Sequence, residues 1–349
     1  MVTHADEKYM KRALYLAQRG GIRVRPNPLV GAVLVKNDCV IGTGYHQYYG
    51  GPHAEIYALK KAQRNAKRST LYVTLEPCNH TGKRPPCSEA IISAGITTVY
   101  IAMKDPNPVV SGKGIQKLKK AGINVTVGLC ENQAKEINKV YIKNILKNEP
   151  FVILKMAQTV DGKTASKTGD SKWISDTLSR NLVHQWRSES EAVMVGAQTV
   201  KHDNPSLTSH GKGRNPIRII IDQKNCIKKS PYIFDNKVKT IIISKNTSPF
   251  KLAYKGNRFN LKHIIKNLYK LGIYQLIVEG GGSLNASALE DGIVDEIRFF
   301  ISPKLLGGRD ALTAVEGNGI TRIRNAVKIS HMTHEQIGSD ILITGRIGG

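Results

Sequence analysis

The segment Leu75-Glu-Pro-Cys78-Asn-His-Thr-Gly-Lys-Arg-Pro-Pro-Cys87 follows a β-rich run, and Gly50-Gly-Pro-His53-Ala-Glu55 lies upstream at the start of a helical pattern. Together they supply His53, Cys78 and Cys87, one His and two Cys of the kind that a catalytic zinc uses as ligands when its fourth position is left to water. Zinc lowers the pKa of such a water to about 7. Glu55 can move a proton without binding the metal, which is the arrangement of zinc deaminases. The two segments therefore predict a zinc-dependent deaminase.

The spacing of the cysteines narrows the class of deaminase. Eight residues separate Cys78 from Cys87, whereas nucleoside and tRNA deaminases carry Pro-Cys-x-x-Cys. Taken singly, a His-x-Glu tripeptide is common, and a cysteine can be a small buried hydrophobe. Here both halves occur in the expected order with a proline before each cysteine. This favours a zinc site with His53, Cys78 and Cys87 as ligands and Glu55 as the catalytic proton carrier.

Around these segments, the first 128 residues alternate helix-like and strand-like patterns. The expected helices cover residues 8–19, 54–66, 88–94 and 115–121. The expected strands cover residues 29–35, 40–44, 70–75, 97–103 and 125–127. The order predicts an α/β domain in which helices cover a sheet.

A domain boundary is expected at Pro150. A polar helix over 131–147 leads to Asn148-Glu149-Pro150, and proline stops a helix. We therefore expect domains at 1–149 and 150–349. The strand Phe151–Ala157 opens a second α/β unit, whose later strands are expected at 192–195, 217–221, 240–244, 275–278 and 296–301.

Length and composition agree with two folded domains. The chain has 349 residues, of which 40% are apolar and 23% charged. No apolar run approaches the roughly 18 residues of a membrane helix, and the polar N-terminus lacks the apolar region of a secretory signal. We expect a soluble cytoplasmic protein without membrane partners. Five cysteines, an odd number, favour metal or free-thiol roles over a disulfide framework.

The net charge of +25 is spread evenly along the chain. Residues 1–150 carry 23 basic and 10 acidic side chains, and residues 151–349 carry 29 and 17. A nucleic-acid arm would concentrate the charge, whereas these lysines accompany many Asn and Ile throughout, as a bias in the coding sequence would produce. The pattern favours a chain without a nucleic-acid partner and is compatible with an anionic substrate.

Beyond Pro150, the stretch Ile277-Val-Glu279-Gly-Gly-Gly-Ser-Leu284 runs from a strand through three glycines into a helix. Such a junction brings backbone N–H groups and a helix N-terminus to a phosphate. The fingerprint of the common dinucleotide fold is absent, and glycine triplets also make plain turns. From this stretch alone, a phosphate-binding site and a simple turn are both possible interpretations.

The segments Pro26–Val35, Gly50–Glu55, Leu75–Cys87 and Asp105–Pro108 resemble the deaminase half of the RibD family of bifunctional riboflavin biosynthesis proteins. The resemblance implies a cytidine-deaminase-like three-layer α/β/α fold with one Zn²⁺ per chain. It implies deamination of 2,5-diamino-6-ribosylamino-4(3H)-pyrimidinone 5′-phosphate. It places in the substrate site Asn27, His46, His80, Lys83, Asp105 and Asn107.

The polar residues of that set suit such a substrate. Asn and Asp side chains match the alternating donors and acceptors of a diaminopyrimidine, and His80 with Lys83 can meet a phosphate. The alternative is that Asn27, Asp105 and Asn107 lie beside prolines as turn residues. The set as a whole favours the site.

Residues 151–345 resemble the reductase half of the same family, which implies a dihydrofolate-reductase-like α/β fold and NADPH as cofactor. The resemblance assigns cofactor contacts to Ala157, Trp173, Thr199, Asp203, Gly281, Gly282, Ser283 and Leu284. It assigns substrate contacts to Ser171, Arg187, Leu207 and Glu279, with Lys155 as a further candidate. Arg187 suits the substrate phosphate, while Trp173 could also be a core residue.

One position departs from the family pattern. The family has Arg two residues after Leu-Thr as a second phosphate contact, and this chain has His210. A neutral His supplies one donor where Arg supplies five. His210 therefore stays in the expected substrate site, with weaker phosphate recognition unless its neighbours Lys212 and Arg214 compensate.

The leading hypothesis is a two-step enzyme, in which deamination is followed by NADPH-dependent reduction of the ribosyl chain to ribityl. The alternatives are an RNA or nucleobase deaminase, motivated by the zinc motif and the charge, and a chain that keeps only the deaminase, motivated by His210. We expect a small phosphorylated pyrimidine as substrate and assembly into a homo-oligomer.

Overall fold

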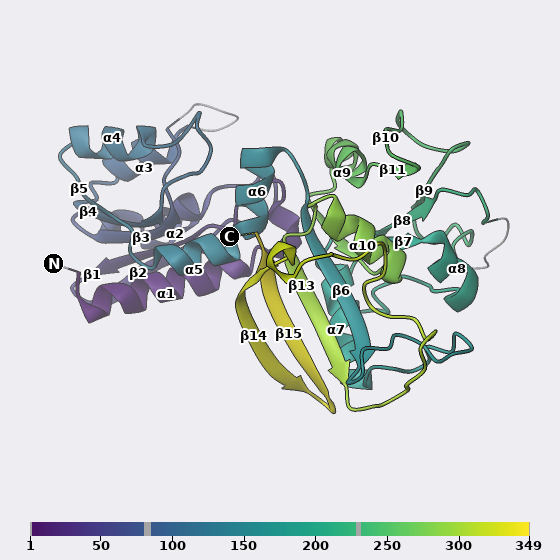
Figure 1. The fold of residues 1–349 in the computed structure, drawn as a ribbon. Coiled ribbons are helices and arrows are strands. Elements are labelled where there is room, and N and C mark those ends of the chain that lie inside the picture. Colours follow the sequence, from purple (N-terminus) through teal and green to yellow (C-terminus); the bar gives the residue numbers. More distant parts are fainter. Residues whose placement is uncertain (1, 80–84, 228–231, 349) are drawn as a thin grey trace. The chain divides into compact units, whose positions relative to one another are not determined.

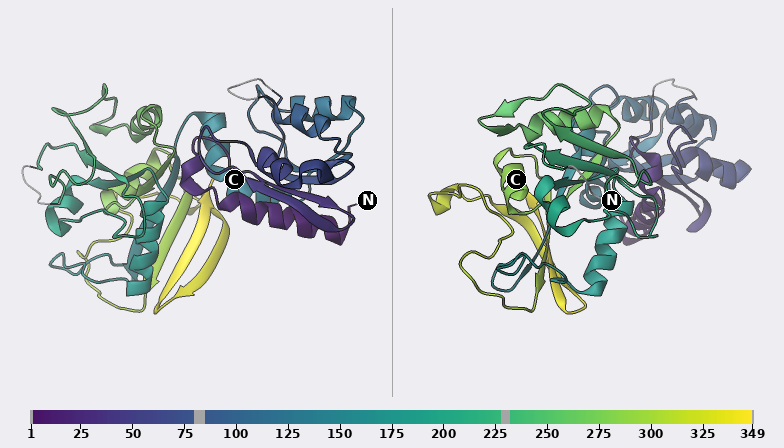
Figure 2. Two further views of the ribbon diagram at one scale, coloured as in Figure 1. Left: turned by 180° about the vertical axis from the view of Figure 1, so that it is seen from behind. Right: turned by 90° about the vertical axis from the view of Figure 1, so that its right-hand side faces the viewer.

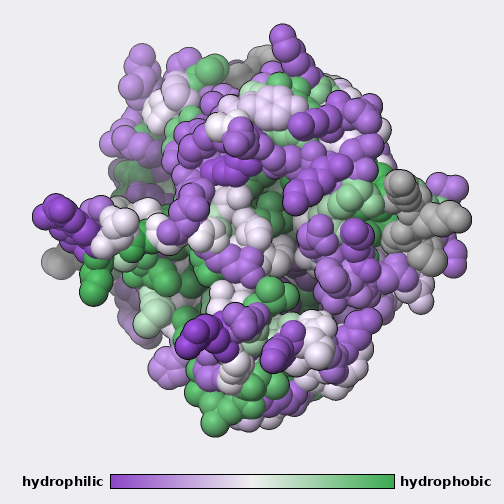
Figure 3. All heavy atoms as spheres, turned by 45° about the vertical axis from the view of Figure 1, so that its right-hand side comes forward, coloured by the Kyte–Doolittle hydropathy of each residue, from purple (hydrophilic) through white to green (hydrophobic). Residues whose placement is uncertain are grey.

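The computed structural model describes residues 2–79, 85–227 and 232–348. The chain divides into two compact units, Met1–Asn148 and Glu149–Gly349, each with its own large sheet (Figures 1 and 2). On the face drawn in Figure 3, hydrophilic side chains predominate over scattered apolar ones. Among the described residues, no helix has the length and apolarity that a membrane crossing requires.

The first unit is built on a five-stranded sheet in the order β2-β1-β3-β4-β5. Strand β1 is antiparallel to β2 and β3, while β3, β4 and β5 are parallel. The strands are β1 (Gly31–Lys36), β2 (Cys39–Tyr45), β3 (Thr70–Leu75), β4 (Thr98–Met103) and β5 (Asn124–Val127). The helices are α1 (His4–Gln18), η1 (Gly21–Val24), α2 (Ala54–Ala62), η2 (Gln63–Ala66), α3 (Cys87–Ser93), α4 (Lys113–Lys120), α5 (Glu131–Ile137) and α6 (Lys139–Lys147).

Helices cover both faces of this sheet because successive strand residues point to opposite sides. Leu71 packs in one apolar cluster with residues of α2, α3 and α4, whereas its neighbour Tyr72 packs in another with residues of α1 and α5. The sequence pattern predicted helices covering a sheet, and the three layers confirm it.

The close approach of α2 to β2 fixes where α2 begins. A Cβ on Gly44 would lie 2.2 Å from the carbonyl oxygen of Ala54, so only glycine fits there. His53, the N-cap of α2, and Glu55, in its first turn, are positioned by this contact.

Strands β3 and β4 run parallel with Leu75 opposite Met103. The residues after each strand therefore emerge at the same edge of the sheet. This brings the segment leading to Cys78 beside the segment that begins at Lys104 and Asp105.

The second unit contains an eight-stranded sheet in the order β14-β15-β13-β6-β12-β7-β8-β9. Strands β13, β6, β12, β7, β8 and β9 are parallel, and the β14–β15 hairpin is antiparallel. The strands are β6 (Phe151–Thr159), β7 (Ala192–Gly196), β8 (Ile217–Asp222), β9 (Thr240–Ser244), β12 (Gln275–Val278), β13 (Glu296–Ser302), β14 (Ile329–Ile337) and β15 (Asp340–Ile347), with a small ribbon of β10 (Tyr254–Lys255) and β11 (Arg258–Phe259). The helices are α7 (Thr177–Ser188), α8 (Ala197–Asp203), α9 (Leu261–Lys270), α10 (Gly282–Glu290) and η3 (Ile323–Asn325).

The tip of the β14–β15 hairpin holds the N-terminus of α7. Asp340, fully buried, accepts hydrogen bonds from Asp176 N at 2.7 Å and from Ser179 Oγ at 2.6 Å. Ser339 donates to the carboxylate of Asp176, the N-cap of α7. The hairpin thus fixes the helix that carries Arg187.

Two features differ from the expected elements. The helix expected over 131–147 is broken at Asn138, whose side chain bonds both backbone groups of Leu29. Strands β14 and β15 were not expected from the sequence. The residues of β14 are nearly all exposed, so this edge strand lacks the apolar alternation that identifies a strand.

Candidate functional site

His53, Cys78 and Cys87 come together at the ends of three elements of the first unit. His53 caps α2, Cys78 follows β3 and Cys87 is the first residue of α3. His53 Nδ1 lies 3.1 Å from Cys87 Sγ and 3.5 Å from Cys78 Sγ, and Cys87 N donates to Cys78 Sγ at 3.3 Å. The sequence predicted that these three side chains share a metal site, and the structure confirms that they lie together.

The chemistry and spacing of these atoms fit zinc. All three ligand atoms lie within 4.8 Å of one another. Ligands of a tetrahedral zinc with usual bond lengths are roughly 3.5 Å apart. Hydrogen bonding by Cys87 lowers the pKa of Cys78, which favours the thiolate that a metal binds. Three protein ligands leave a fourth position, as in a catalytic site.

Glu55 lies beside these ligands and is 3% exposed. Burial raises the pKa of its carboxyl group, against the opposing effect of His53. Within the described part of the chain, its Oε2 atom is buried without a hydrogen-bond partner. An acceptor left in this way beside a metal site suits a group that exchanges a proton with a bound reactant.

A short chain of hydrogen bonds joins Asn27 to this site. His46 Nδ1 lies 2.9 Å from the carbonyl oxygen of Pro52, to which it donates, so Nε2 accepts from Asn27 Nδ2 at 3.1 Å. Burial lowers the pKa of His46, in agreement with this neutral ring. The His46 ring meets the edge of the His53 ring with centroids 5.7 Å apart.

Asp105 and Asn107 lie in one loop after β4. The carboxylate of Asp105 accepts from Asn107 N at 2.9 Å, and Asn107 Oδ1 accepts from Val109 N at 3.1 Å. Both side chains thus make turn contacts, and Asp105 is also 8% exposed and bonded outside the loop. His80 and Lys83 lie outside the described residues.

A second cluster lies in the other unit, where Lys155 on β6, Arg187 on α7 and Glu279 after β12 meet. Arg187 Nε and Nη2 donate to the two oxygens of Glu279 at 2.7 and 2.8 Å, and Nη1 donates to the carbonyl oxygen of Thr208 at 3.1 Å. The ion pair is about nine-tenths buried, with side chains 11% and 9% exposed. Burial would raise the pKa of Glu279, but Arg187 and Lys155 outweigh it and lower that pKa.

Two histidines extend this cluster. The rings of His184 and His210 are stacked with centroids 4.1 Å apart, and Ser206 Oγ lies 3.0 Å from His210 Nε2. Burial, His210 and Arg187 lower the pKa of His184 to about 4. Burial and Arg187 also lower the pKa of His210. His210 is therefore a neutral imidazole beside Arg187.

The glycine stretch forms a turn into α10. The first N–H groups of a helix have no partner inside it, so those of Gly282 and Ser283 can bind an anion. A side chain at Gly281 would begin 3.6 Å from Thr199 Oγ1 on α8, which places Thr199 beside the turn. Ser283 Oγ donates to Glu316 at 2.7 Å. The backbone of this turn can therefore bind an anionic group.

Ser171 and Trp173 are two residues apart in one loop. This loop contacts Asp203 through Ser171. Ser171 Oγ donates to Asp203 Oδ1 at 3.2 Å. Trp173 is 63% exposed, with the guanidinium of Arg180 4.5 Å from its ring centroid, so it is not a core residue. Lys304 donates to the carbonyl oxygens of Trp173 and the next residue.

Two further residues of the predicted reductase site, Leu207 and Ala157, differ in how exposed they are. Leu207 is 2% exposed and packs in an apolar cluster with residues of β7, so its side chain belongs to the core. Ala157 lies on β6 opposite Phe300 of β13 and is partly exposed.

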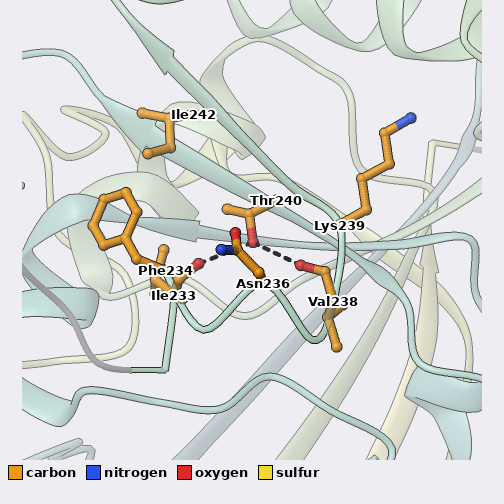
Figure 4. Close-up of a pocket in the computed structure, with 7 residues that line it drawn as sticks. All are labelled: Ile233, Phe234, Asn236, Val238, Lys239, Thr240 and Ile242. Carbon is orange, nitrogen blue, oxygen red and sulfur yellow. Dashed lines mark hydrogen bonds between the residues drawn. The ribbon is translucent and has the colours of Figure 1, made fainter.

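A pocket of about 240 Å³ lies at β9, the edge strand of the sheet. Figure 4 shows the residues that line it. Its lining residues are Ile233, Phe234, Asn236, Val238, Lys239, Thr240 and Ile242. Thr240 Oγ1 donates within this pocket to the carbonyl oxygens of Ile233 and Val238. None of the predicted site residues lines it.

Sequence reasoning missed several residues of both sites. Glu76 and Tyr141 bond the loop of Asp105, and His184 and Glu316 join the second unit's cluster and glycine turn. Glu76 directly precedes Pro77-Cys78, so its position in the motif was the one signal available.

Comparisons with known proteins match both units. The cytidine and deoxycytidylate deaminase zinc-binding region matches residues 3–103, and the RibD C-terminal domain matches residues 150–343. The riboflavin biosynthesis protein RibD of Aquifex aeolicus is 44% identical over 98% of this chain and 99% of its own length. The Escherichia coli protein of the same name is 36% identical over 97% of this chain and 98% of its own.

Solved structures agree over the full length. A diaminohydroxyphosphoribosylaminopyrimidine deaminase/5-amino-6-(5-phosphoribosylamino)uracil reductase from Thermotoga maritima is 38% identical, with a TM-score of 0.88 and 99% of both chains covered. RibD from Acinetobacter baumannii is 34% identical, with a TM-score of 0.87 and the same coverage. The chain therefore belongs to the RibD family, and it is a bifunctional deaminase and reductase of riboflavin biosynthesis that uses zinc, NADPH and a pyrimidine substrate.

Proposed function

We propose that this chain deaminates 2,5-diamino-6-ribosylamino-4(3H)-pyrimidinone 5′-phosphate and then reduces the ribosyl chain of the product to ribityl. Residues 1–149 would carry the first step and residues 150–349 the second. The observation that carries the proposal is the buried Oε2 of Glu55, which has no hydrogen-bond partner among the described residues and lies beside three metal ligands within 4.8 Å of one another. The Thermotoga maritima relative, which is described as acting on such compounds, supports the choice of substrate.

In the deaminase step, His53, Cys78 and Cys87 would hold the metal and Glu55 would carry the proton. Zinc, when bound, supplies the acidity that makes water a nucleophile at neutral pH. Water adds to the ring carbon that bears the amino group; Glu55 accepts a proton from it and delivers one to the departing ammonia. Burial raises the pKa of Glu55 above its ordinary value, which favours uptake of the proton.

The pyrimidine would lie among Asn27, His46, Asp105 and Asn107. An amide can both donate to and accept from the ring edge, whereas a carboxylate accepts from its N–H groups. His46 acts through Asn27, since its Nε2 accepts one amide hydrogen of that side chain. The substrate phosphate is assigned to His80 and Lys83.

In the reduction, the chain's task is to orient the substrate ribose against the cofactor. NADPH, when bound, supplies the hydride that reaches ribose C1′. We assign its phosphates to the turn of Gly281, Gly282, Ser283 and Leu284, and its remaining contacts to Ala157, Trp173, Thr199 and Asp203.

The substrate of this step would lie against Lys155, Ser171, Glu279 and the phosphate-binding Arg187. In its contacts with the described residues, Arg187 gives three of its five N–H donors to Glu279 and Thr208, which leaves two for a phosphate. His210 would contact the same phosphate, and Leu207 would contribute only its backbone.

The remaining expectations concern location and partners. Evenly spread charge supports a chain that takes no nucleic acid as substrate. Its membership of a family of riboflavin biosynthesis proteins supports a cytoplasmic location. We also propose a homo-oligomer, whose state sedimentation measures directly.

The decisive experiment supplies the diaminopyrimidine phosphate and NADPH to the purified chain and follows ammonia and NADPH absorbance together. Ammonia release should precede NADPH oxidation, and omission of NADPH should leave ammonia release intact. Oxidation of NADPH without prior ammonia release would contradict the proposed order. Release of ammonia from cytidine or RNA, with none from the pyrimidine phosphate, would contradict the substrate.

A further inference from the structure

The loop between β4 and α4 carries Asp105 and Asn107, and two side chains from outside it set its shape. One is Glu76, from the segment that leads to Cys78, and the other is Tyr141, on α6. Both lie in the first unit. Neither belongs to the zinc ligands or to the residues assigned to the substrate.

Glu76 closes the loop through its carboxylate. Its Oε2 accepts from Asp105 N at 3.4 Å and from Gly112 N at 2.9 Å, so both ends of the loop meet at one oxygen. Its Oε1 accepts from Gly114 N at 3.0 Å and from Ile115 N at 3.3 Å, in the first turn of α4. Glu76 is 4% exposed, and a buried carboxylate with these backbone donors is held firmly.

The same segment touches α4 directly. A Cβ on Gly114 would lie 1.9 Å from the carbonyl oxygen of Pro77, so the helix start packs against the residue before Cys78. A displacement of the loop would therefore require a displacement of the zinc-ligand segment.

Tyr141 fixes the side chain that the loop presents. Its hydroxyl donates to Asp105 Oδ1 at 2.9 Å, and Asn107 N donates to the same oxygen at 2.9 Å. Burial and Asp105 raise the pKa of Tyr141, so the hydroxyl keeps its proton and remains a donor. Two donors on one oxygen set the orientation of the Asp105 carboxylate.

We propose that Tyr141 and Glu76 are positioning residues of the deaminase, which fix the Asp105 carboxylate in the orientation that accepts N–H groups of the pyrimidine. The inference rests on the substrate role proposed above for Asp105. Tyr141 orients the carboxylate plane and Glu76 fixes the backbone beneath it. The arrangement selects a ring that presents donors at that edge, as an amino-substituted pyrimidine does.

The clean test is Tyr141→Phe, which removes one hydroxyl and keeps the ring. The KM of deamination should rise roughly tenfold, as expected for loss of a hydrogen bond to a charged group. The kcat and the zinc content should stay near their original values, because Tyr141 touches neither metal nor Glu55 in the described contacts. An unchanged KM, or a fall in kcat alone, would overturn the proposal.

A double-mutant cycle separates this inference from the proposed pocket. Asp105→Ala alone should raise KM, and adding Tyr141→Phe to it should raise KM no further. If Asp105→Ala leaves KM unchanged, the pocket assignment fails. If Asp105→Ala raises KM and Tyr141→Phe multiplies it equally in both backgrounds, the pocket stands and the positioning role is wrong.

Tyr72→Phe is the matched control. Tyr72 is buried and its hydroxyl donates to Asp6 Oδ1 at 2.5 Å, so the same chemical bond is lost against α1. The control should lower the melting temperature without raising KM. A KM increase equal to that of Tyr141→Phe would show a general loss of rigidity and overturn the proposal.

Glu76→Gln tests the second residue. The glutamine side chain turns one acceptor into a donor that faces backbone N–H groups, so the loop loses contacts at one end. KM should rise at least as much as in Tyr141→Phe while bound zinc remains stoichiometric. Retention of the original KM by a folded, zinc-loaded Glu76→Gln protein would remove Glu76 from the proposal.

Discussion

The two candidate sites are assembled in different ways. The metal ligands of the first unit fall between residues 53 and 87 and lie at the ends of α2, β3 and α3. The cluster of the second unit draws Lys155, Arg187, His210 and Glu279 from four separate parts of the chain. The first site depends on a short motif with its own chemistry, whereas the second depends on ion pairs that only the fold brings together.

Removal of a metal ligand should have the largest effect of the predicted changes. It should affect the deaminase unit and leave the reductase unit active. In Cys78→Ser, zinc binding and ammonia release should be lost, and the first unit should be less stable, because metal binding contributes to folding. NADPH oxidation with the pre-deaminated substrate should continue. Metal analysis and the two activity assays measure this.

Cys39→Ser provides the control for that variant, since Cys39 is exposed and lies outside the site. It should keep both zinc and activity. A Cys78→Ser protein that retains stoichiometric zinc and deamination would contradict the ligand assignment.

Glu55→Gln should separate proton transfer from metal binding. The variant keeps the shape of the side chain and loses the titrating group, so zinc should stay bound while deamination falls by roughly 10³-fold. Glu89→Gln, an exposed acid that pairs with Lys117 on the surface, is the control and should be near normal. Loss of zinc from Glu55→Gln would show that Glu55 acts as a ligand.

The sequence predicted the sheet and helices of the first unit because their apolar residues alternate or recur at helical spacing. It also predicted which three side chains could share a metal, since the motif is local. It could not predict Glu76 or Tyr141, whose partners lie 29 and 36 residues away. Their role follows from the parallel pairing of β3 with β4 and from the packing of α6.

In the second unit, the sequence indicated the glycine turn and a basic residue for phosphate. The sequence did not indicate that Arg187 pairs with Glu279, because each of them is an ordinary polar residue in its own segment. The exposed β14 strand was missed for the opposite reason, since its stability comes from pairing with β15 rather than from an apolar face.

Glu279→Gln should show how much the second site depends on its ion pair. Removing one partner leaves Arg187 buried without its counter-charge, which costs about 3 kcal/mol of unfolding free energy. Both tryptophans lie in the second unit, so their fluorescence in urea reports that unit. The KM of the reductase substrate should also rise.

Glu290→Gln is the matched control, because Glu290 is 45% exposed and pairs with Arg258 on the surface. Its loss should cost less than about 1 kcal/mol. Equal losses of unfolding free energy for Glu279→Gln and Glu290→Gln would show that the buried ion pair stabilises the unit no more than the exposed one does.

The smallest effect concerns His210 and pH. Burial and Arg187 lower the pKa of His210, so its ring is neutral near pH 7 in the free enzyme. A bound phosphate beside it would stabilise the imidazolium and raise that pKa. The charged form therefore contributes to substrate binding at low pH and is lost as pH rises, and the KM of the reductase should increase between about pH 6 and 8.5.

The substrate phosphate loses its own second proton near pH 6, which strengthens binding as pH rises and opposes this trend. The informative quantity is therefore the ratio of KM between the original enzyme and His210→Arg at each pH. That ratio should grow by a few-fold from low to high pH, because arginine keeps its charge throughout. His184, stacked on His210, has a pKa of about 4 and adds no charge in this range. A ratio that does not change with pH would mean that His210 does not contact the phosphate and that Arg187, Lys212 or Arg214 binds it.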